Sequence, residues 1–314
     1  MPHGGDHERR YGSSRELPGG DSVTTTSPAR DRVWFITGAS RGLGRAFAEA
    51  ALAAGDRVAA AARDTEALAA LAADHPGRVL DLPLDVTDRA AVFAAVDRAA
   101  DHFGRVDIVV NNAGTLSMGA VEEFTEAEAR AQMEVNFFGA LWVSQAALGR
   151  MRAQGAGHIV QVSSIGAVAG HASTGLYSAS KFALEGMSEA LAAEVARFGV
   201  RVSIVQPGGY WTELYTRMRT AQPMAEYDPM RAELEEQYAS AGPTDSEPRL
   251  AAEAVLTLVD SDDPPRRLLL GGMVYDLAFD VYRGRMAEWE RWEDVSRAAE
   301  HPVPPPEWLF PAAG

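Results

Sequence analysis

The stretch VWFITGASRGLG, residues 33–44, joins an apolar run to a glycine-rich turn. Residues 33–37 have the character of a buried strand, and an Ala-rich helical segment begins near Leu43. Glycines in such a turn let the backbone approach a pyrophosphate, and the helix N-terminus supplies amide donors and a positive dipole. A glycine cluster also occurs in ordinary strand–helix loops, so the surrounding pattern has to decide between the two interpretations.

The same alternation of strand and helix continues outward from this stretch. The expected strands are Val33–Thr37, Arg57–Ala62, Val79–Leu84, Asp107–Val110, His158–Ser163, Val200–Gln206 and Leu268–Leu270. The expected helices are Leu43–Ala54, Thr65–Ala73, Arg89–His102, Glu126–Ala153, Tyr177–Phe198 and Ala251–Asp260. The strands are almost continuously apolar, which is typical of a parallel sheet covered on both faces. We therefore predict an α/β fold, a doubly wound parallel sheet of seven strands with helices on both faces.

The chain divides into a tail, a body and an extension. Residues 1–30 are rich in Gly, Ser, Thr, Pro and charge, which predicts a flexible tail. Residues 31–271 contain no linker and are interpreted as one domain, in which 208–247 departs from the alternation as an insertion. Residues 272–314 form a helical extension with a proline-rich tail, where Trp308, Leu309 and Phe310 are expected to act as anchors.

Composition excludes several classes of partner. The 314 residues carry a formal net charge of −15 and no cysteine. An acidic chain is poorly suited to nucleic acid, and without cysteine there are no disulfides and no thiolate chemistry. No group of His, Asp and Glu has convincing metal-ligand spacing, and no apolar run is long enough to span a membrane. Arg9 and Arg10 lack the apolar stretch of an export signal, so we expect a cytoplasmic protein.

Further motifs follow the glycine turn in a defined order. They are Asn111-Asn112-Ala113-Gly114, Asn136 in a long helix, Ser164, the pair Tyr177 and Lys181, and Pro207-Gly208. Together with TGASRGLG, they resemble the short-chain dehydrogenase/reductase family, in its compact single-domain subgroup, over roughly residues 32–271. The resemblance implies a Rossmann-type fold and hydride transfer between a nicotinamide cofactor and a carbonyl or alcohol.

The chemistry expected of this family needs a proton donor beside the carbonyl oxygen. Tyr177 and Lys181 lie four residues apart, on one face of a helix, and Lys181 is the only lysine in the chain. A nearby cation lowers the pKa of a tyrosine toward neutrality, and a compact ammonium also holds ribose hydroxyls, which a planar Arg fork does not do as well. A Tyr and a Lys one turn apart usually lie on a solvent-exposed helix face. Here the pair stands at the position of the catalytic motif of the family that the chain resembles, which favours a catalytic role.

The resemblance adds two polar residues to the catalytic set. It places the catalytic serine at Ser164, where the hydroxyl positions the substrate oxygen, and we interpret Ser163 as a strand-end serine bonded to local backbone. Asn136 lies in an apolar helix, where a buried amide needs hydrogen bonds and a local helix distortion is expected. In the family, that distorted helix holds a water that links the asparagine to the lysine and to a proton path.

The cofactor preference depends on the end of the second strand. Ala62 stands where NAD-using relatives carry an acid that repels a 2′-phosphate. Arg63 follows and can pair with that phosphate, and Arg41 adds a second cation. Asp64 is the competing ribose-binding acid, but we interpret it as a helix N-cap. NADP(H) is therefore favoured over NAD(H).

Other cofactor contacts are implied by the resemblance. Asp85 is expected at the adenine edge, or else as a turn acid, and Thr212 is expected to bind the nicotinamide carboxamide or a phosphate. The full set also contains Gly38, Ser40, Arg41, Gly42, Leu43, Gly44, Arg63, Val86, Asn112, Ala113, Gly114, Tyr177, Lys181, Pro207 and Gly208.

Substrate contacts are expected from loops at the carboxyl ends of the strands. The candidates are Ser117, Met118, His171, Leu176, Tyr210 and Trp211. The many Met and aromatic residues of 208–247 suit a bulky, mostly apolar ketone or alcohol, or they pack a helical lid onto the sheet. Residues 273–299 carry aromatics near helical spacing, which suits a cover for the substrate mouth, a subunit contact or a surface helix.

The combined expectation is an NADP(H)-dependent carbonyl reductase that also runs as an alcohol dehydrogenase. Tyr177 is the expected general acid, Lys181 its electrostatic and ribose partner, Ser164 the carbonyl clamp and Asn136 the relay support. The alternatives are a non-catalytic NADP(H)-binding sensor or scaffold, and a dehydration or epimerisation on the same scaffold. Family members commonly form dimers or tetramers through two long helices, here near 126–153 and 177–198, so a homodimer or homotetramer is expected.

Overall fold

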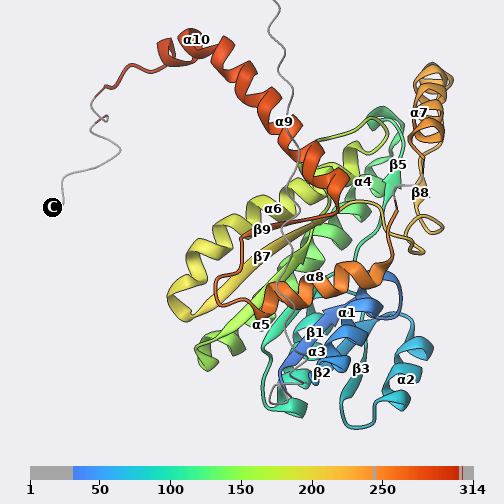
Figure 1. Ribbon diagram of the computed structural model, residues 1–314, viewed down its shortest axis with the longest axis vertical. Coiled ribbons are helices and arrows are strands. Elements are labelled where there is room, and N and C mark those ends of the chain that lie inside the picture. The colour runs from blue at the N-terminus through green and yellow to red at the C-terminus, as the bar shows by residue number, and fades with distance from the viewer. Residues whose placement is uncertain (1–30, 243–244, 304–305, 307–314) are drawn as a thin grey trace, which may run out of the picture.

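The computed structural model describes residues 31–242, 245–303 and 306, and its core is a single parallel sheet (Figure 1). The predicted tail 1–30 and the anchors at 308–310 lie outside the described residues. The strands are β1 (Val33–Thr37), β2 (Arg57–Ala62), β3 (Val79–Pro83), β4 (Ile108–Asn111), β6 (Gly157–Val162), β7 (Val200–Pro207) and β9 (Arg267–Leu270). Their order in the sheet is β3-β2-β1-β4-β6-β7-β9, with every pair parallel. The predicted doubly wound fold is confirmed, and chain order reverses between β1 and β4, where such sheets bind ligands.

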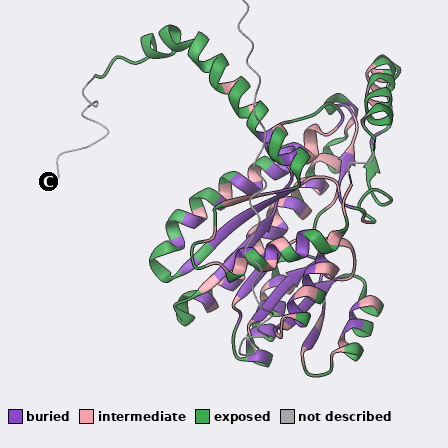
Figure 2. Ribbon diagram, viewed as in Figure 1, coloured by how far each residue is buried: buried purple, intermediate pink, exposed green. Residues whose placement is uncertain are grey.

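Helices cover both faces of the sheet because alternate strand residues point to opposite sides. Trp34 and Ile36 of β1 belong to one apolar core, whereas Val33 and Phe35 belong to the other. The first core is closed by α1 (Gly42–Ala53), α2 (Thr65–Asp74) and α8 (Pro248–Asp260). The second is closed by α3 (Arg89–Phe103), α5 (Gly139–Gln154) and α6 (Gly175–Val195). In Figure 2 the strands are accordingly buried along most of their length.

The long helix predicted over 126–153 is interrupted at its centre. It consists of α4 (Glu126–Met133), a π-helical turn at Glu134–Phe138 and then α5. Asn136 lies in this turn and is buried. Wide turns of this kind occur mostly as single bulges and often at functional sites. The expected helix distortion around Asn136 is confirmed.

The insertion contributes one strand of a second, two-stranded sheet that the sequence did not predict. Strand β5 (Ser117–Met118) pairs in parallel with β8 (Arg219–Thr220), and α7 (Asp228–Ala241) follows at the side of the body (Figure 1). We call residues 219–241 the lid. Glu123, which is buried, holds the lid: its Oε1 accepts the Met224 amide at 2.8 Å and pairs with Arg231 at 2.6 Å.

The extension begins on the body and then leaves it. Helix α9 (Gly272–Arg291) buries only Val274 and Ala278, and α10 (Glu293–Ala298) buries nothing. From 282 to 303 every residue except Arg285 is exposed, and the helix projects away from the sheet (Figures 1 and 2). Among the described residues, no helix has both the length and the apolar character needed to cross a membrane.

Candidate active site

The glycine turn has a shape that side chains would obstruct. Gly38 and Gly42 adopt positive φ values of 67° and 52°. A Cβ at Gly44 would lie 2.2 Å from the Gly38 carbonyl oxygen and 2.5 Å from Asn112 Nδ2. The turn therefore requires glycine at these positions, and it leads directly into the N-terminus of α1, the end of a helix that favours anionic groups.

The loop after β4 is fastened to this turn through Thr37. The Thr37 hydroxyl accepts the backbone amides of Asn112 and Ala113, each at 3.0 Å, and Asn112 Nδ2 donates to the Thr37 carbonyl at 2.9 Å. Gly114 is exposed at the end of this loop, and a Cβ there would be 3.8 Å from Lys181 Nζ. The predicted cofactor residues from two separate motifs thus form one continuous backbone cradle, which fits a dinucleotide.

The catalytic candidates meet beside the cradle. Gly166 shows their closeness, because a Cβ on it would lie 3.3 Å from the Tyr177 ring and 3.5 Å from Ser164 Oγ. Ser164 Oγ accepts the Gly166 amide at 3.1 Å, and its hydroxyl is also hydrogen-bonded to Tyr177. Lys181 is buried and donates from Nζ to the Val162 carbonyl at 2.8 Å, so two of its three protons remain available.

Burial controls the proton affinity of both groups. It raises the pKa of Tyr177, and the hydrogen bond with Ser164 only partly opposes the rise. Burial also lowers the pKa of Lys181 to about 8, and the negative charge of Glu185 opposes this decrease. The predicted lowering of the Tyr177 pKa by Lys181 is not found, because Nζ points to Val162 and lies 5.8 Å from the ring centroid. Tyr177 therefore holds its proton at neutral pH, as a proton donor must.

Ser163 has a different partner from the one expected. Its hydroxyl donates to Glu185 Oε1 at 2.5 Å rather than to local backbone. The same oxygen accepts Gln206 Nε2 at 2.8 Å, and Arg267 Nε lies 3.2 Å from Oε2. Glu185 is buried, one helical turn after Lys181, so it ties β6, β7 and β9 to the catalytic helix. Sequence reasoning missed this residue, although its spacing from Lys181 places both on one helix face.

Asn136 is fully engaged with the protein. Its Oδ1 accepts the Thr115 amide at 2.8 Å, and its Nδ2 donates to the Thr115 carbonyl and to Ser180 Oγ, both at 3.0 Å. A Cβ on Gly114 would lie 3.4 Å from Oδ1 and 3.8 Å from Lys181 Nζ, so both side chains border this glycine. Asn136 therefore positions the loop after β4 relative to the catalytic helix.

The end of β2 is arranged as the sequence indicates. Asp64 caps α2, accepting the Ala67 amide at 3.3 Å, which confirms its interpretation as an N-cap. Arg63 is exposed and lies 3.9 Å from Asp85. Partial burial would raise the pKa of Asp85, but hydrogen bonds from Thr87 and the charge of Arg63 lower it below its ordinary value. The bonds from Thr87 are those expected of a turn acid. They do not test the other expected role of Asp85, at the adenine edge.

The remaining cofactor candidates differ in their surroundings. Thr212 lies against Gly42, where a Cβ would be 3.2 Å from its side chain. Val86 is buried against Gly139 of α5, so its side chain belongs to the core. Pro207 ends β7, and the Gly208 amide donates to the Leu270 carbonyl at 3.4 Å. Ser40, Arg41 and Leu43 are partly exposed in or beside the glycine turn.

The substrate candidates are not all brought together. Met118 and Leu176 are partly exposed, and His171 is exposed. Ser117, by contrast, is buried and donates to Gln132 Oε1 at 2.6 Å, so its hydroxyl is held inside the protein.

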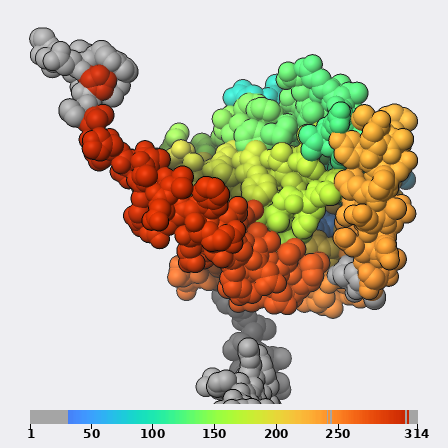
Figure 3. Space-filling view, turned by 90° about the horizontal axis from the view of Figure 1, so that it is seen from above, coloured from blue at the N-terminus to red at the C-terminus, as the bar shows by residue number. Residues whose placement is uncertain are grey.

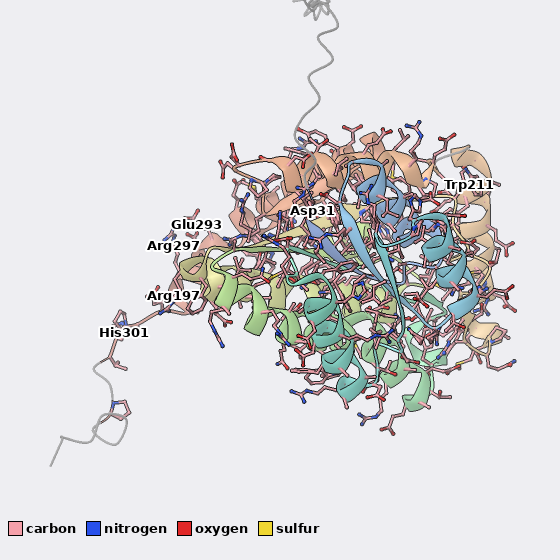
Figure 4. The ribbon with its side chains drawn as sticks, turned by 90° about the horizontal axis from the view of Figure 1, so that it is seen from below. Asp31, Arg197, Trp211, Glu293, Arg297 and His301 are labelled. Atoms are coloured by element: carbon pink, nitrogen blue, oxygen red, sulfur yellow. The ribbon has the colours of Figure 1, made fainter. Side chains whose placement is uncertain are left out.

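Tyr210 and Trp211 are placed elsewhere than the sequence suggests. Tyr210 is buried in the core under α1 and α8, and the Trp211 amide donates to the Ser246 carbonyl at 3.0 Å, which turns the segment outward. Trp211 is 65% exposed and lines an open groove of about 430 Å³ with Gly42 and Pro248, on the opposite side of the body from Glu293 and Arg297 (Figure 4). Tyr210 therefore packs in the core and does not make the expected substrate contact, because the segment after β7 pairs with Ser246.

Tyr215 of the insertion is bound to Asp245 and lies within electrostatic range of Tyr177. Its hydroxyl lies 3.4 Å from Asp245 Oδ1. Burial, then the charge and hydrogen bond of Asp245, raise the pKa of Tyr215 to about 12, and Tyr177 adds to the rise. The two phenols are thus electrostatically coupled, across two elements that are far apart in sequence. In the described part of the chain, no cluster of three His, Asp or Glu side chains could hold a metal ion.

Known proteins share this architecture and its motifs. The chain matches the model of the short chain dehydrogenase family over residues 32–223. Oxidoreductase BOA17 of Botryotinia fuckeliana is 39% identical over 85% of this chain and 99% of its own length. A short-chain dehydrogenase of Streptomyces avermitilis superposes with a TM-score of 0.77 at 40% identity, over 86% of this chain and 100% of its own. One from Burkholderia cenocepacia, in complex with NADP, has a TM-score of 0.67 at 32% identity, over 83% and 96%. The chain therefore belongs to the short-chain dehydrogenase family and is an oxidoreductase built to bind a nicotinamide cofactor.

Proposed function

We propose that the protein is an NADP(H)-dependent oxidoreductase that interconverts a bulky, mostly apolar ketone and its secondary alcohol. The observation that carries this proposal is the meeting of Tyr177, Ser164 and Lys181 beside the cradle of the glycine turn. The glycine positions fit a dinucleotide because side chains there would fill the cradle. When bound, the cofactor supplies or accepts the hydride.

The residues of the chain supply the rest of the chemistry. The O–H of Ser164, which lies beside Tyr177, donates to the carbonyl oxygen and holds it next to that phenol. Tyr177, protonated at neutral pH, gives its proton to that oxygen as negative charge develops, so the ketone gains one hydride and one proton. Lys181 faces the phenolate that remains and binds the ribose with its two free protons. Asn136 keeps the neighbouring loop in position.

The preference for NADP(H) is supported by three residues at the end of β2. Ala62 offers no carboxylate, Asp64 is used as a helix cap, and Arg63 is exposed and turned toward Asp85. We expect Arg63 to pair with the 2′-phosphate, with Arg41 adding charge from the turn. Arg63→Ala is then expected to raise KM for NADPH roughly tenfold or more and to leave KM for NADH unchanged. An equal effect on both cofactors would contradict this assignment.

The substrate class is supported by large apolar side chains of the insertion. Leu214, Tyr215, Met218 and Tyr238 of the insertion are 36–65% exposed, which suits an apolar partner. The test is a screen of NADPH oxidation against aliphatic, aromatic and larger polycyclic ketones, with the larger ones expected to turn over fastest. A preference for small polar carbonyls would exclude the proposed class.

The mechanism is tested by Tyr177→Phe. Turnover with ketones is expected to be abolished while NADPH still binds, because the ring is kept and only the proton donor is lost. Undiminished turnover would refute the mechanism. NADPH binding by the unaltered protein without activity on any ketone or alcohol would instead support the sensor or scaffold alternative, and product mass distinguishes reduction from dehydration or epimerisation. We further propose a cytoplasmic homodimer or homotetramer that uses the long helices near 126–153 and 177–198.

A further inference from the structure

The outer part of α9 has no support from its own chain. Beyond Val281, only Arg285 is partly buried, and all other residues to 303 are exposed. Figure 3 shows this segment reaching out from the body on the side opposite α7. The part of α9 beyond Val281 is too short to be stable as an isolated helix in water, and Gly284 in its interior weakens it further. Helical structure here therefore calls for a partner surface.

A stripe of large apolar side chains runs along the same helix. Its members are Tyr275, Phe279, Tyr282, Met286 and Trp289, which are 54%, 45%, 45%, 54% and 64% exposed. Their spacing alternates between four and three residues, the pattern by which two helices pack side by side. Single exposed apolar residues are ordinary, but a continuous stripe marks an interaction site.

The position of the stripe suits a twofold partner. Val274 and Ala278 face the body, and the stripe residues Tyr275 and Phe279 each follow one of them. One residue corresponds to about 100° around an α-helix, so the stripe lies roughly a quarter turn from the body-facing side. Two such helices paired along their stripes would therefore carry their bodies on opposite sides of the pair, without collision.

Charges beside the stripe favour a parallel partner of the same sequence. Arg285 precedes Met286 and Glu290 follows Trp289, so these two residues flank the seam five positions apart. In a parallel pair, residues with this relation meet across the seam, and Arg285 of each copy would meet Glu290 of the other. Arg283 is already paired within the helix to Asp280 at 2.6 Å.

The charge of the extension also argues against a membrane as its partner. Residues 272–299 contain four arginines and six acidic residues. Helices that lie on anionic lipid surfaces carry an excess of positive charge on their polar face. A second copy of the chain satisfies both the apolar stripe and the flanking charges.

We propose that α9 pairs in parallel with α9 of a second copy of this chain, along the stripe from Tyr275 to Trp289. This interface is separate from the long helices near 126–153 and 177–198. Together with a twofold interface along those helices, it would close into a tetramer where the two twofold axes cross at right angles.

The test uses the absence of cysteine from the full chain. Met286→Cys places a single thiol on the stripe, and Gly284→Cys places one on the opposite, exposed side of the same helix. Under mild oxidation, Met286→Cys is expected to form a disulfide-linked dimer and Gly284→Cys is not. A Met286→Cys protein that stays unlinked, or equal linkage of both variants, would overturn the proposal, and it would point to another protein or a lipid surface on the stripe.

A charge exchange tests the parallel arrangement. In the Met286→Cys background, Arg285→Glu alone and Glu290→Arg alone are each expected to slow cross-linking roughly tenfold, because each places like charges across the seam. The double exchange restores opposite charges and is expected to restore the rate. Failure of the double variant to recover would overturn the parallel pairing.

Discussion

Replacing Glu185 with glutamine removes one buried negative charge and keeps the shape of the side chain. The carboxylate accepts Ser163 at 2.5 Å and Gln206 at 2.8 Å, and pairs with Arg267 at 3.2 Å. Glutamine keeps one acceptor oxygen but turns an NH₂ group toward one of these donors. Hydrogen bonds to buried charges contribute roughly 1.5–3 kcal/mol, so we expect the free energy of unfolding to fall by about 2 kcal/mol.

The same substitution is expected to change the titration of Lys181. Its pKa of about 8 reflects burial opposed by the charge of Glu185, so removal of that charge lowers it further. With a pKa of about 8, roughly nine in ten Lys181 side chains are charged at pH 7, and each unit of decrease reduces the charged-to-neutral ratio tenfold. A charged Lys181 is needed for cofactor binding, so the loss is expected at neutral and higher pH and is expected to vanish at lower pH.

The assay is the pH profile of kcat/KM for NADPH, which reports groups of the free enzyme. The alkaline limb is expected to move to lower pH in Glu185→Gln. Glu189→Gln is the matched control, because Glu189 also pairs with Arg267, at 2.6 Å, but its side chain is 49% exposed. A merely structural role would lower activity evenly across pH, so an unshifted alkaline limb in Glu185→Gln would refute the electrostatic reasoning.

Three further predictions concern the glycine turn, the lid and acid stability. Gly44→Ala is expected to abolish NADPH binding in a fluorescence titration, since its Cβ would lie 2.2 Å from the Gly38 carbonyl, whereas Gly149→Ala, in open space, binds normally. Glu123→Gln weakens the contacts of Glu123 with Met224 and Arg231, so the lid is expected to be cleaved faster by a protease. The same variant is expected to raise KM for the ketone more than it lowers kcat. Unchanged cleavage would contradict the anchoring role of Glu123. Burial lowers the pKa of His158 to about 4 in the folded protein, whereas the unfolded chain takes up this proton near pH 6.5. The free energy of unfolding, measured in urea, is therefore expected to fall by up to about 3 kcal/mol as the pH decreases from about 6.5 to about 4. His158→Gln should lack that part of the loss, and an equal loss in the variant would assign it to other groups.

Much of the fold and the catalytic set followed from local sequence. The strands were predicted because a parallel sheet covered on both faces requires continuous apolar runs, and the structure has all seven in one parallel sheet. Tyr177 and Lys181 were found from helical spacing, and the distortion at Asn136 from a polar residue in an apolar helix. These patterns involve residues that are only a few positions apart in the sequence, and such residues are also close together in space.

The errors arose where distant segments meet. The pairing of β5 with β8 joins residues about one hundred positions apart, and neither short segment has a sequence pattern that predicts the pairing. Tyr210 looked like a substrate contact, but the neighbouring Trp211 amide bonds to Ser246, and the ring enters the core. The Ser163 hydroxyl donates to Glu185 of α6, so the prediction that it bonds to local backbone was wrong.

The sequence by itself determined the parallel sheet and the glycine turn, because these depend on apolar runs and on residues without side chains, and its resemblance to a known family supplied the proposed catalytic residues. Only the tertiary structure decided which charges act on them. Burial raises the pKa of Tyr177 against the hydrogen bond with Ser164, and burial lowers the pKa of Lys181 against the charge of Glu185. Desolvation and Coulomb interactions depend on distance in space, and the chain order alone does not fix that distance.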